Sequence, residues 1–324
     1  MTKSQPVHNE GEVSPNRVDL WRHINARFRK RLVFHVGYDA GFFSEINNMV
    51  LAIVYCLNHE IRFMLYSEDA NFGNGKGWTD IFRPFCDESD NNLHHSFNKR
   101  WLSEREQKSL KSRLKYFLIK KWLGIDYFTH DLWFPIRAQP IEGPYDFPAL
   151  DLRGDLRFVC GEIAKMVFRP KPEIEDQISR LKSDLNLSTD YIGIHIRSGD
   201  KLREHALFGL SEYMDAAERI SSLRVCFVLT DDFAMIDEIE RMYENWQVAT
   251  LCRPTEHGYD HRAHVQLKAE ERFEAIIRLI ASMQILSNAR HFIGTYSTNP
   301  GMFLGMIMEK ERCKALDFDN WRVW

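Results

Sequence analysis

The sequence has no long apolar run and no excess of charge of one sign. Nowhere do its 324 residues approach the ~18–20 consecutive apolar residues that a membrane span needs. Its 46 acidic and 43 basic residues leave a net charge of −3, which argues against a nucleic-acid coat or a polybasic membrane binder. The polar N-terminal stretch also lacks the apolar core of a secretory signal. We therefore expect no transmembrane segment, no nucleic-acid partner and no signal peptide.

Paired cysteines are missing as well. No C-x-x-C motif occurs, and the six cysteines are widely spaced, which favours reduced thiols in apolar surroundings over a disulfide scaffold. The nearest candidate zinc site combines His257, His261 and His264 with Cys252. Gly258 makes a helix there unfavourable, so a polar loop that contacts substrate is the preferred interpretation.

Several catalytic signatures are absent too. There is no G-x-x-x-x-G-K-[ST] phosphate loop and no G-x-S-x-G nucleophile elbow. The Asp-x-Asp pattern of metal-dependent sugar transferases occurs only as Asp317-Phe318-Asp319, close to the C-terminus. We therefore expect no metal and no cofactor.

What the first half does contain is a strand–helix–strand pattern. Residues 1–28 predict a flexible arm, with little apolar periodicity. RLVFHVG then predicts a buried strand, GFFSEINN a loop, NMVLAIVYCLNHE a packed helix and IRFMLYS a second strand, which is typical of a parallel sheet. Residues 67–98 are rich in loop-forming residues.

Residues 99–122 are charged and predict a helix with apolar positions near helical spacing. A solvated face is our expectation for this helix, with self-association and contact with a membrane surface as the alternatives. A proline-rich connector follows from Pro135 to Pro148, and helices are expected near 155–168 and 172–185.

The second half alternates strands and helices more regularly. Strands are predicted at 191–196, 224–230, 246–251 and 290–294, with helices at 210–220, 233–245 and 269–289 between them. This order predicts a doubly wound α/β domain. We expect a first α/β domain over 29–187, on the acceptor side, and a second over 188–324, with a cleft between them.

Polar turns follow three of these strands. They are Arg197-Ser198-Gly199-Asp200-Lys201, then Thr230-Asp231-Asp232, and finally Thr295-Tyr296-Ser297-Thr298-Asn299-Pro300. Arginine, lysine and the free N–H groups of a helix start all suit an anion such as phosphate. A solvated salt-bridged turn or a helix cap explains each turn taken alone. Together they would meet at one edge of one sheet, which is where open α/β sheets bind ligands.

These turns resemble a known family in their order and spacing. YIGIHIRSGDK, EYM, LTDD and LSNARHFIGTYSTN are similar to the donor-binding half of fucosyltransferases, most closely the α1,6-fucosyltransferase group. The resemblance covers about residues 190–310. In the first half it is limited to Gly41-Phe42-Phe43-Ser44-Glu45, after the first strand.

The resemblance implies a GT-B fold, in which two Rossmann-like domains face each other across a cleft. It further implies inverting, metal-independent transfer of L-fucose from GDP-fucose to a glycan acceptor, through an α1,6 linkage to GlcNAc. On the donor side, Arg197 would hold the β-phosphate of GDP, His195 would lie near the nucleoside, and Ser297, Thr298 and Asn299 would hold phosphate oxygens. Asp231, Gly41 and Phe43 complete the implied donor site.

The resemblance also implies a catalytic group. Lys201 would orient a carboxylate base, which is Glu204 if one residue is deleted from the loop; without that deletion His205 takes the position, and Asp200 is the second choice. This sequence departs from the family pattern at Ser198, where a second arginine is usual, in its final Ser-Thr-Asn motif, and at Ser282, where an aspartate is expected.

The alternatives to this interpretation are a fucosyltransferase of another linkage (α1,2 or protein O-linked), another nucleotide-sugar transferase, and a non-catalytic nucleotide-sugar-binding protein. The acceptor would be recognised by the first half and by loops 67–98 and 253–268. We expect a cytoplasmic protein, with peripheral attachment to a membrane as one option. A Golgi-type enzyme that has lost its anchor would have an identical sequence, and the oligomeric state stays open.

Overall fold

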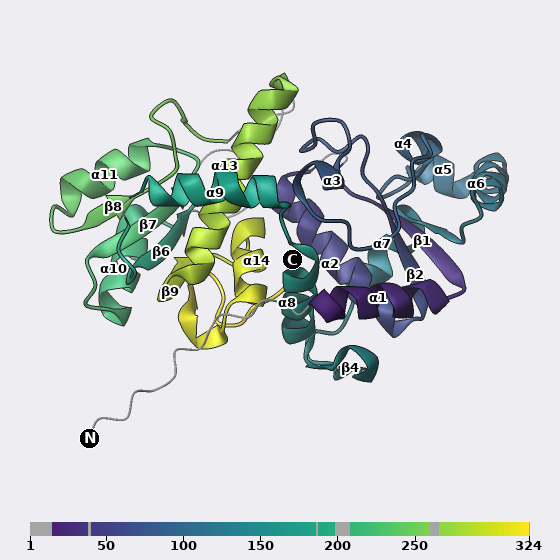
Figure 1. The fold of residues 1–324 in the computed structure, drawn as a ribbon, viewed down its shortest axis with the longest axis horizontal. Helices are drawn as coiled ribbons and strands as arrows, with labels where there is room; N and C mark the ends of the chain where they lie inside the picture. Colours follow the sequence, from purple (N-terminus) through teal and green to yellow (C-terminus); the bar gives the residue numbers. More distant parts are fainter. Residues whose placement is uncertain (1–14, 38–39, 186, 198–207, 260–265, 324) are drawn as a thin grey trace.

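A computed structural model describes residues 15–37, 40–185, 187–197, 208–259 and 266–323. It confirms a mixed α/β fold with parallel sheets. The first half of the chain, in purple and blue, and the second half, in green and yellow, lie side by side in Figure 1.

The first half contains a parallel sheet with strand order β2-β1-β3. Lys30 pairs with Ile61 and His35 with Tyr66 along β1 and β2, so the two strands end together. The elements of this half are α1 (Pro15–Arg27), β1 (Lys30–His35), α2 (Phe42–Asn58), β2 (Ile61–Tyr66), α3 (Trp78–Ile81), α4 (Leu93–Phe97), α5 (Glu104–Lys108), α6 (Leu110–Leu123), β3 (Tyr127–Phe128), α7 (Thr129–Arg137), β4 (Tyr145–Phe147), β5 (Leu152–Gly154), α8 (Leu156–Val167) and α9 (Pro172–Ser183).

The expectation of a loose arm over residues 1–28 is wrong for residues 15–27, which form α1. Trp21 on this helix is fully buried. The Asn25 side-chain amide donates to the Phe63 carbonyl oxygen at 2.8 Å, and its oxygen accepts from the Phe63 N–H at 2.7 Å. Because Asn25 occupies backbone groups of β2, α1 is fastened to the sheet despite its weak apolar periodicity. Residues 1–14 lie outside the described residues.

The loop expected over GFFSEINN is also wrong, because α2 begins at Phe42. The polar residues that suggested a loop make hydrogen bonds within α2 and to α14. Asn48 donates to the Ser44 carbonyl oxygen at 2.7 Å, and Asn47 donates to the Asn299 carbonyl oxygen at 3.0 Å. The second of these bonds joins the two halves of the chain.

The second half contains a five-stranded parallel sheet with strand order β10-β9-β6-β7-β8. The expected strands and helices are present, although several ends differ by a few residues. The elements are β6 (Ile192–Ile196), α10 (Leu210–Ile220), β7 (Val225–Thr230), α11 (Ala234–Met242), β8 (Gln247–Ala249), α13 (Ala269–Asn288), β9 (His291–Gly294), α14 (Asn299–Ile307) and β10 (Cys313–Ala315).

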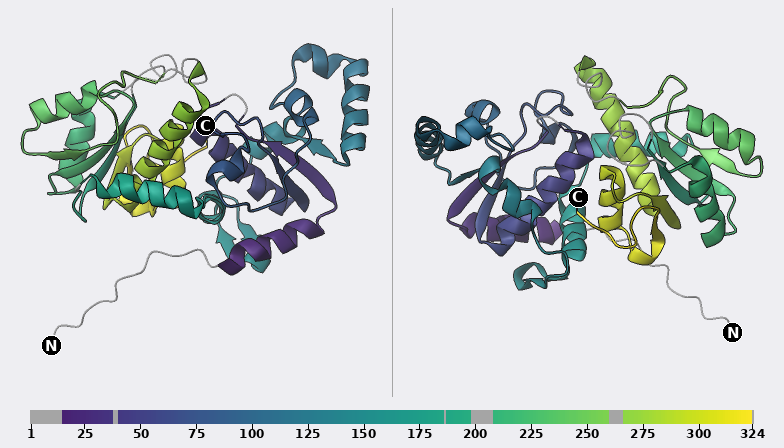
Figure 2. Two further views of the ribbon diagram at one scale, coloured as in Figure 1. Left: turned by 45° about the horizontal axis from the view of Figure 1, so that its top comes forward. Right: turned by 180° about the vertical axis from the view of Figure 1, so that it is seen from behind.

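One hydrophobic core is shared by both halves. A single cluster of buried side chains includes Phe34 of β1 and Ile277 of α13. The Phe43 and Phe303 rings lie 4.9 Å apart between their centroids, which brings α2 against α14. Helix α9 packs against α13, and Figures 1 and 2 show α9 beside the second half.

The helix predicted over 99–122 is divided at Ser109 into α5 and α6. The Ser109 backbone is extended, and its hydroxyl accepts from the Ser112 N–H at 3.3 Å, which starts the second helix. In the described residues, no helix has both the length and the apolar character to cross a membrane. All six cysteines are free thiols, as expected, and Cys56, Cys160 and Cys226 are buried.

Candidate active site

A pocket of about 730 Å³ lies where residues of both halves meet. Its first-half lining includes Ala40, Gly41, Ser44 and Asn71. Its second-half lining comes from the ends of β6 and β7, the start of α14, and the face of α13 around Arg278. The pocket therefore includes all three strand-end turns that the sequence singled out, at one edge of the five-stranded sheet.

Arg197 follows β6 and lines the pocket. Its Nη1 donates to Asp231 Oδ2 at 2.8 Å, and its guanidinium lies 5.1 Å from the centroid of the Tyr259 ring. Asp231 Oδ2 also accepts from the Tyr259 N–H at 2.9 Å. Asp231 thus binds both Arg197 and the backbone of Tyr259, whose ring lies beside the guanidinium. Its carboxylate therefore positions the arginine at the pocket.

His195 lies in β6 and is only 4% exposed. Burial lowers the pKa of its imidazole to about 4, and the nearby Arg197 charge acts in the same direction. Its Nδ1 lies 3.4 Å from the Thr298 hydroxyl. A neutral imidazole, with one donor and one acceptor nitrogen, therefore faces the pocket at neutral pH.

The third turn caps α14. The Thr298 hydroxyl accepts from the Gly301 N–H at 3.3 Å and donates to the Thr295 carbonyl oxygen at 2.9 Å, while Pro300 lies in the first turn of the helix. Thr298, Asn299 and Pro300 line the pocket. The Asn299 carbonyl oxygen is held by Asn47, so α2 fixes the start of α14 from the other half.

Asp317, which belongs to the Asp-x-Asp pattern in the sequence, binds the backbone of this turn. Its two carboxylate oxygens accept from the Tyr296 and Ser297 N–H groups, both at 2.8 Å. The Ser297 N–H is therefore engaged within the protein. Ser297, expected to hold phosphate with Thr298 and Asn299, is not among the residues that line the pocket.

On the first-half side, Gly41 lines the pocket as expected, but Phe43 does not. Phe43 is 2% exposed, and its ring packs against Phe42, Phe168 and Phe303 in the core. Phe43 therefore faces the core and not the pocket, because residues one apart on α2 point in different directions. Ser44 and Phe42 line the pocket in its place.

Sequence reasoning missed one side of the pocket. Leu229, Leu251, Ile276 and Leu279 supply apolar lining, and Asn71 supplies a polar group. Nothing in the sequence marked the four apolar residues, because apolar positions of strands and helices look alike whether they face the core or a pocket. Asn71 lies in loop 67–98, which the sequence analysis assigned to recognition of the acceptor.

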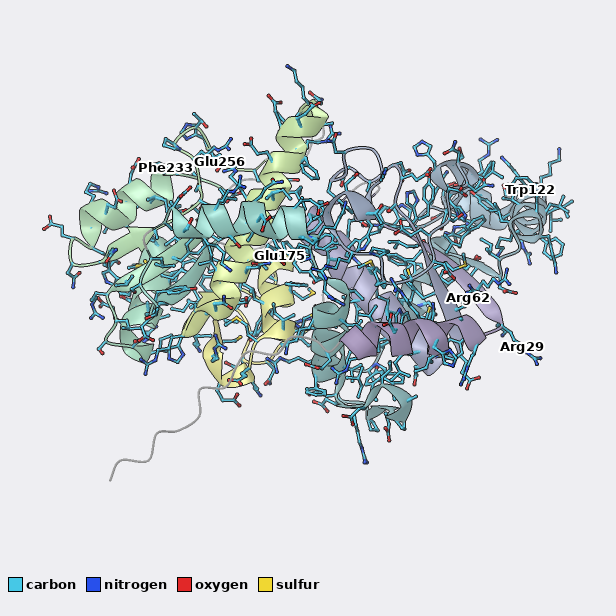
Figure 3. The ribbon with its side chains drawn as sticks, viewed as in Figure 1. Arg29, Arg62, Trp122, Glu175, Phe233 and Glu256 are labelled. Carbon is cyan, nitrogen blue, oxygen red and sulfur yellow. The ribbon has the colours of Figure 1, made fainter. Side chains whose placement is uncertain are left out.

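An ion pair forms the rim beside this apolar lining. The Arg278 Nη2 lies 2.6 Å from Glu256 Oε1, and Arg278 Nη1 donates to the Leu251 carbonyl oxygen at 3.0 Å. Burial acts to raise the pKa of Glu256, but the Arg278 guanidinium and the Arg253 N–H keep it below its usual range. Figure 3 labels Glu256 next to Phe233, whose N–H donates to the Glu256 carbonyl oxygen at 2.8 Å.

Some predicted residues lie outside the described ones. They are Asp200, Lys201, Glu204 and His205 of the first turn, and His261 and His264 of the histidine-rich loop. His257 is described and lies 4.0 Å from Asp232. Across the ranges that the structure describes, no three His, Cys, Asp or Glu side chains are grouped to hold a metal ion.

Comparison with known proteins identifies the family. Residues 24–300 match the family described as α-(1,6)-fucosyltransferase N- and catalytic domains. The chain belongs to the α-(1,6)-fucosyltransferase family. This confirms the resemblance found in the strand-end motifs, and the match extends it across most of the first half.

Individual members of the α-(1,6)-fucosyltransferase family are distant in sequence. The α-(1,6)-fucosyltransferase of Drosophila melanogaster is 22% identical over an alignment of 310 positions that covers 89% of this chain and 46% of that protein. The chain thus spans about half the length of this relative.

Two crystal structures share the fold. NodZ α-1,6-fucosyltransferase soaked with GDP-fucose is 13% identical, with a TM-score of 0.53 over 90% of this chain and 95% of that one. Fucosyltransferase NodZ from Bradyrhizobium is 14% identical, with a TM-score of 0.53 over 90% and 96%.

Proposed function

We propose that this protein transfers L-fucose from GDP-fucose to a hydroxyl group of a glycan acceptor. The observation that supports this most directly is the pocket, in which Arg197 after β6 and the start of α14 face one space in a member of this family. We further propose a GT-B arrangement, with domains over 29–187 and 188–324 on either side of that pocket.

The donor would be held by residues that the structure already fixes. A guanidinium has five N–H groups in a planar fork that suits phosphate oxygens. The Nη1 bond to Asp231 orients that fork, so Arg197 is positioned for the diphosphate before the donor arrives. The Thr298–Asn299 turn would contact the same group, and the neutral His195 would lie towards the nucleoside.

Fucosyl transfer by inversion needs one base and an in-line approach. The acceptor oxygen forms a bond to the anomeric carbon of fucose while the bond from that carbon to the β-phosphate oxygen breaks. The acceptor proton passes to a carboxylate, for which we propose Glu204, with Asp200 as the second choice and Lys201 orienting the base. The leaving GDP takes the bonding electron pair, and Arg197 stabilises the negative charge that develops.

The proposal assigns charge neutralisation to Arg197 and the helix start, so it requires no metal ion. Turnover is therefore expected to be unchanged by EDTA. Loss of turnover with chelator and its recovery with added Mg²⁺ or Mn²⁺ would contradict this part of the proposal. For the acceptor we propose GlcNAc, linked through its 6-hydroxyl; the α1,6 linkage agrees with the names of the Drosophila melanogaster relative and of NodZ, which are both α1,6-fucosyltransferases.

The test is a GDP-fucose transfer assay against a panel of glycan acceptors, with linkage analysis of the product. Wild-type protein is expected to form an α1,6 product, and Arg197→Ala to lose transfer while it keeps its circular dichroism spectrum. Arg241→Ala, an exposed position on α11, is the matched control and is expected to keep full activity. Near-normal turnover of Arg197→Ala would refute the assignment. GDP-fucose binding without transfer or hydrolysis would favour a non-catalytic binding protein.

A further inference from the structure

Helix α6 exposes a row of apolar side chains. Five of the eleven large apolar side chains that the described residues leave exposed lie on this helix: Leu110 (77%), Leu114 (59%), Phe117 (52%), Leu118 (56%) and Trp122 (70%). Their spacing of four, three, one and four residues places them on one side of an α-helix. Contiguous apolar surface of this kind usually marks a site of interaction.

The opposite face of α6 already holds the helix in place. Tyr116 is buried, and Ile119 and Leu123 pack against a cluster that includes Val33 and Phe128 of the first sheet. The Tyr116 hydroxyl also donates to Glu106 at 3.1 Å. Since the inward face fastens α6 to the fold, the outward apolar side chains are not needed for its own packing.

The charge on α6 has one sign. Residues 110–123 include Lys111, Arg113, Lys115, Lys120 and Lys121 but no aspartate or glutamate. Lys120 lies 2.9 Å from Asp131, and it is the one α6 cation for which the described residues provide an ion-pair partner within 4.0 Å. The whole chain has a net charge of −3, so this positive surface is local to the helix.

We propose that α6 binds the surface of an anionic lipid bilayer, with its axis parallel to the membrane plane. Exposed leucine, phenylalanine and tryptophan side chains together with many lysines and arginines are features of helices that bind a membrane interface. The lysine stems can cover apolar surface while their ammonium groups reach lipid phosphates. The 14 residues of α6 extend about 21 Å, less than the roughly 30 Å of a hydrocarbon core, so the helix lies on the membrane.

Charge also argues against a second copy of the chain as the partner. Pairing two α6 faces would bring together eight cations for which the described residues provide no ion-pair partner, with no carboxylate from either helix, whereas an anionic surface complements them.

The position of α6 allows binding without obstruction of the pocket. The helix lies at the outer edge of the first half in Figures 1 and 2, and Trp122 projects at that edge in Figure 3. No α6 residue lines the pocket. The proposal therefore goes beyond the transfer reaction and is independent of it.

The experiment is flotation of the full chain with phosphatidylcholine vesicles, with and without phosphatidylglycerol. Wild-type protein is expected to bind only the anionic vesicles and to dissociate at high salt. Leu118→Gln/Trp122→Gln should weaken binding by about tenfold or more through lost insertion, and Lys115→Glu/Lys121→Glu by at least as much through reversed charge.

The matched controls lie on exposed positions of α10 and α11. Met242→Gln replaces an exposed apolar side chain, and Arg219→Glu/Arg241→Glu makes the same change of net charge as the lysine pair. Both are expected to bind like wild type. Equal binding by the α6 variants, or no wild-type binding to anionic vesicles, would overturn the proposal. Dimerisation in analytical ultracentrifugation that is lost in Leu118→Gln/Trp122→Gln would assign this face to a second copy instead.

Discussion

Arg197 is held by groups from two separate segments of the second half. Asp231 at the end of β7 binds its Nη1, and Tyr259 lies under its guanidinium. The Tyr259 N–H in turn donates to the same Asp231 oxygen. One carboxylate oxygen thus sets both the orientation of the cation and the position of the ring beside it.

Replacing Asp231 by asparagine should therefore weaken donor binding, because Arg197 loses the charged partner that orients its guanidinium. A charge-assisted bond contributes about 1.5–3 kcal/mol, so Asp231→Asn is expected to raise the Kd for GDP by roughly tenfold to a hundredfold. Isothermal titration calorimetry with GDP measures this. Asp237→Asn, on the neighbouring α11, is the control. Unchanged affinity in Asp231→Asn would show that Arg197 keeps its orientation without this carboxylate.

His195 predicts a pH dependence of stability. The pKa of its imidazole is about 4 in the folded state, against 6.5 for an unperturbed histidine. Because the unfolded chain binds the proton more readily, stability is complete above about pH 6.5 and is lost as the pH falls towards 4. The loss from this group is on the order of 3 kcal/mol at the lower end.

Urea denaturation between these pH values tests the effect. His195→Gln should flatten the dependence of the unfolding free energy on pH, whereas His23→Gln, at an exposed position on α1, should leave it unchanged. A wild-type slope in His195→Gln would mean that other groups cause the acid sensitivity.

At the scale of elements, the turn before α14 depends on a residue far along the chain. Asp317 accepts from the Tyr296 and Ser297 N–H groups with its two oxygens. The turn is thereby held in the shape that lets Thr298 cap the helix.

Asp317→Asn exchanges one acceptor oxygen for an amide donor and removes the charge. We expect a loss of about 1–3 kcal/mol in unfolding free energy. GDP affinity should also fall, because the turn lines the pocket through Thr298 and Asn299. Thermal unfolding with and without GDP measures both effects, with Asp319→Asn as the control. A stability equal to wild type would show that backbone geometry alone holds the turn.

The sequence predicted β1, β2, β6, β7, β8 and β9 because each lies in a mostly apolar run, but it did not predict β3 and β10, which are only two and three residues long. It also predicted where Arg197, His195 and Asn299 would meet, since strand ends of a parallel sheet share one edge. It failed where polar residues have partners distant in sequence. Asn25 binds Phe63 and Asn47 binds Asn299, and neither pairing leaves a local pattern. The sequence also did not show that Phe43 faces the core while Ser44 faces the pocket, because one residue along a helix turns the side chain by about 100°.

At the scale of the whole molecule, the shared core couples the two halves. Phe43 of α2 packs against Phe303 of α14 and against Phe168, and all three belong to or pack against one cluster. The Asn47–Asn299 bond joins the same two helices, since Asn47 follows Phe43 in α2 and Asn299 precedes Phe303 in α14.

Phe43→Ala is expected to lower the unfolding free energy by about 3–5 kcal/mol, since it leaves a cavity in this shared core. Calorimetry should show a single unfolding transition in both proteins, with the transition of the variant at a lower temperature. The exposed Phe134 provides the control, and Phe134→Ala should change stability by about 0.5 kcal/mol or less. Two separate transitions in either protein would indicate that the halves unfold independently.

The bond between Asn47 and Asn299 also limits how such proteins can be recombined. A hybrid of two family members joined near residue 187 would combine α2 from one parent with α14 from the other. The start of α14, which lines the pocket, would then contact an α2 helix from the other parent. Such a hybrid should recover its donor site only when α2 and α14 come from the same parent.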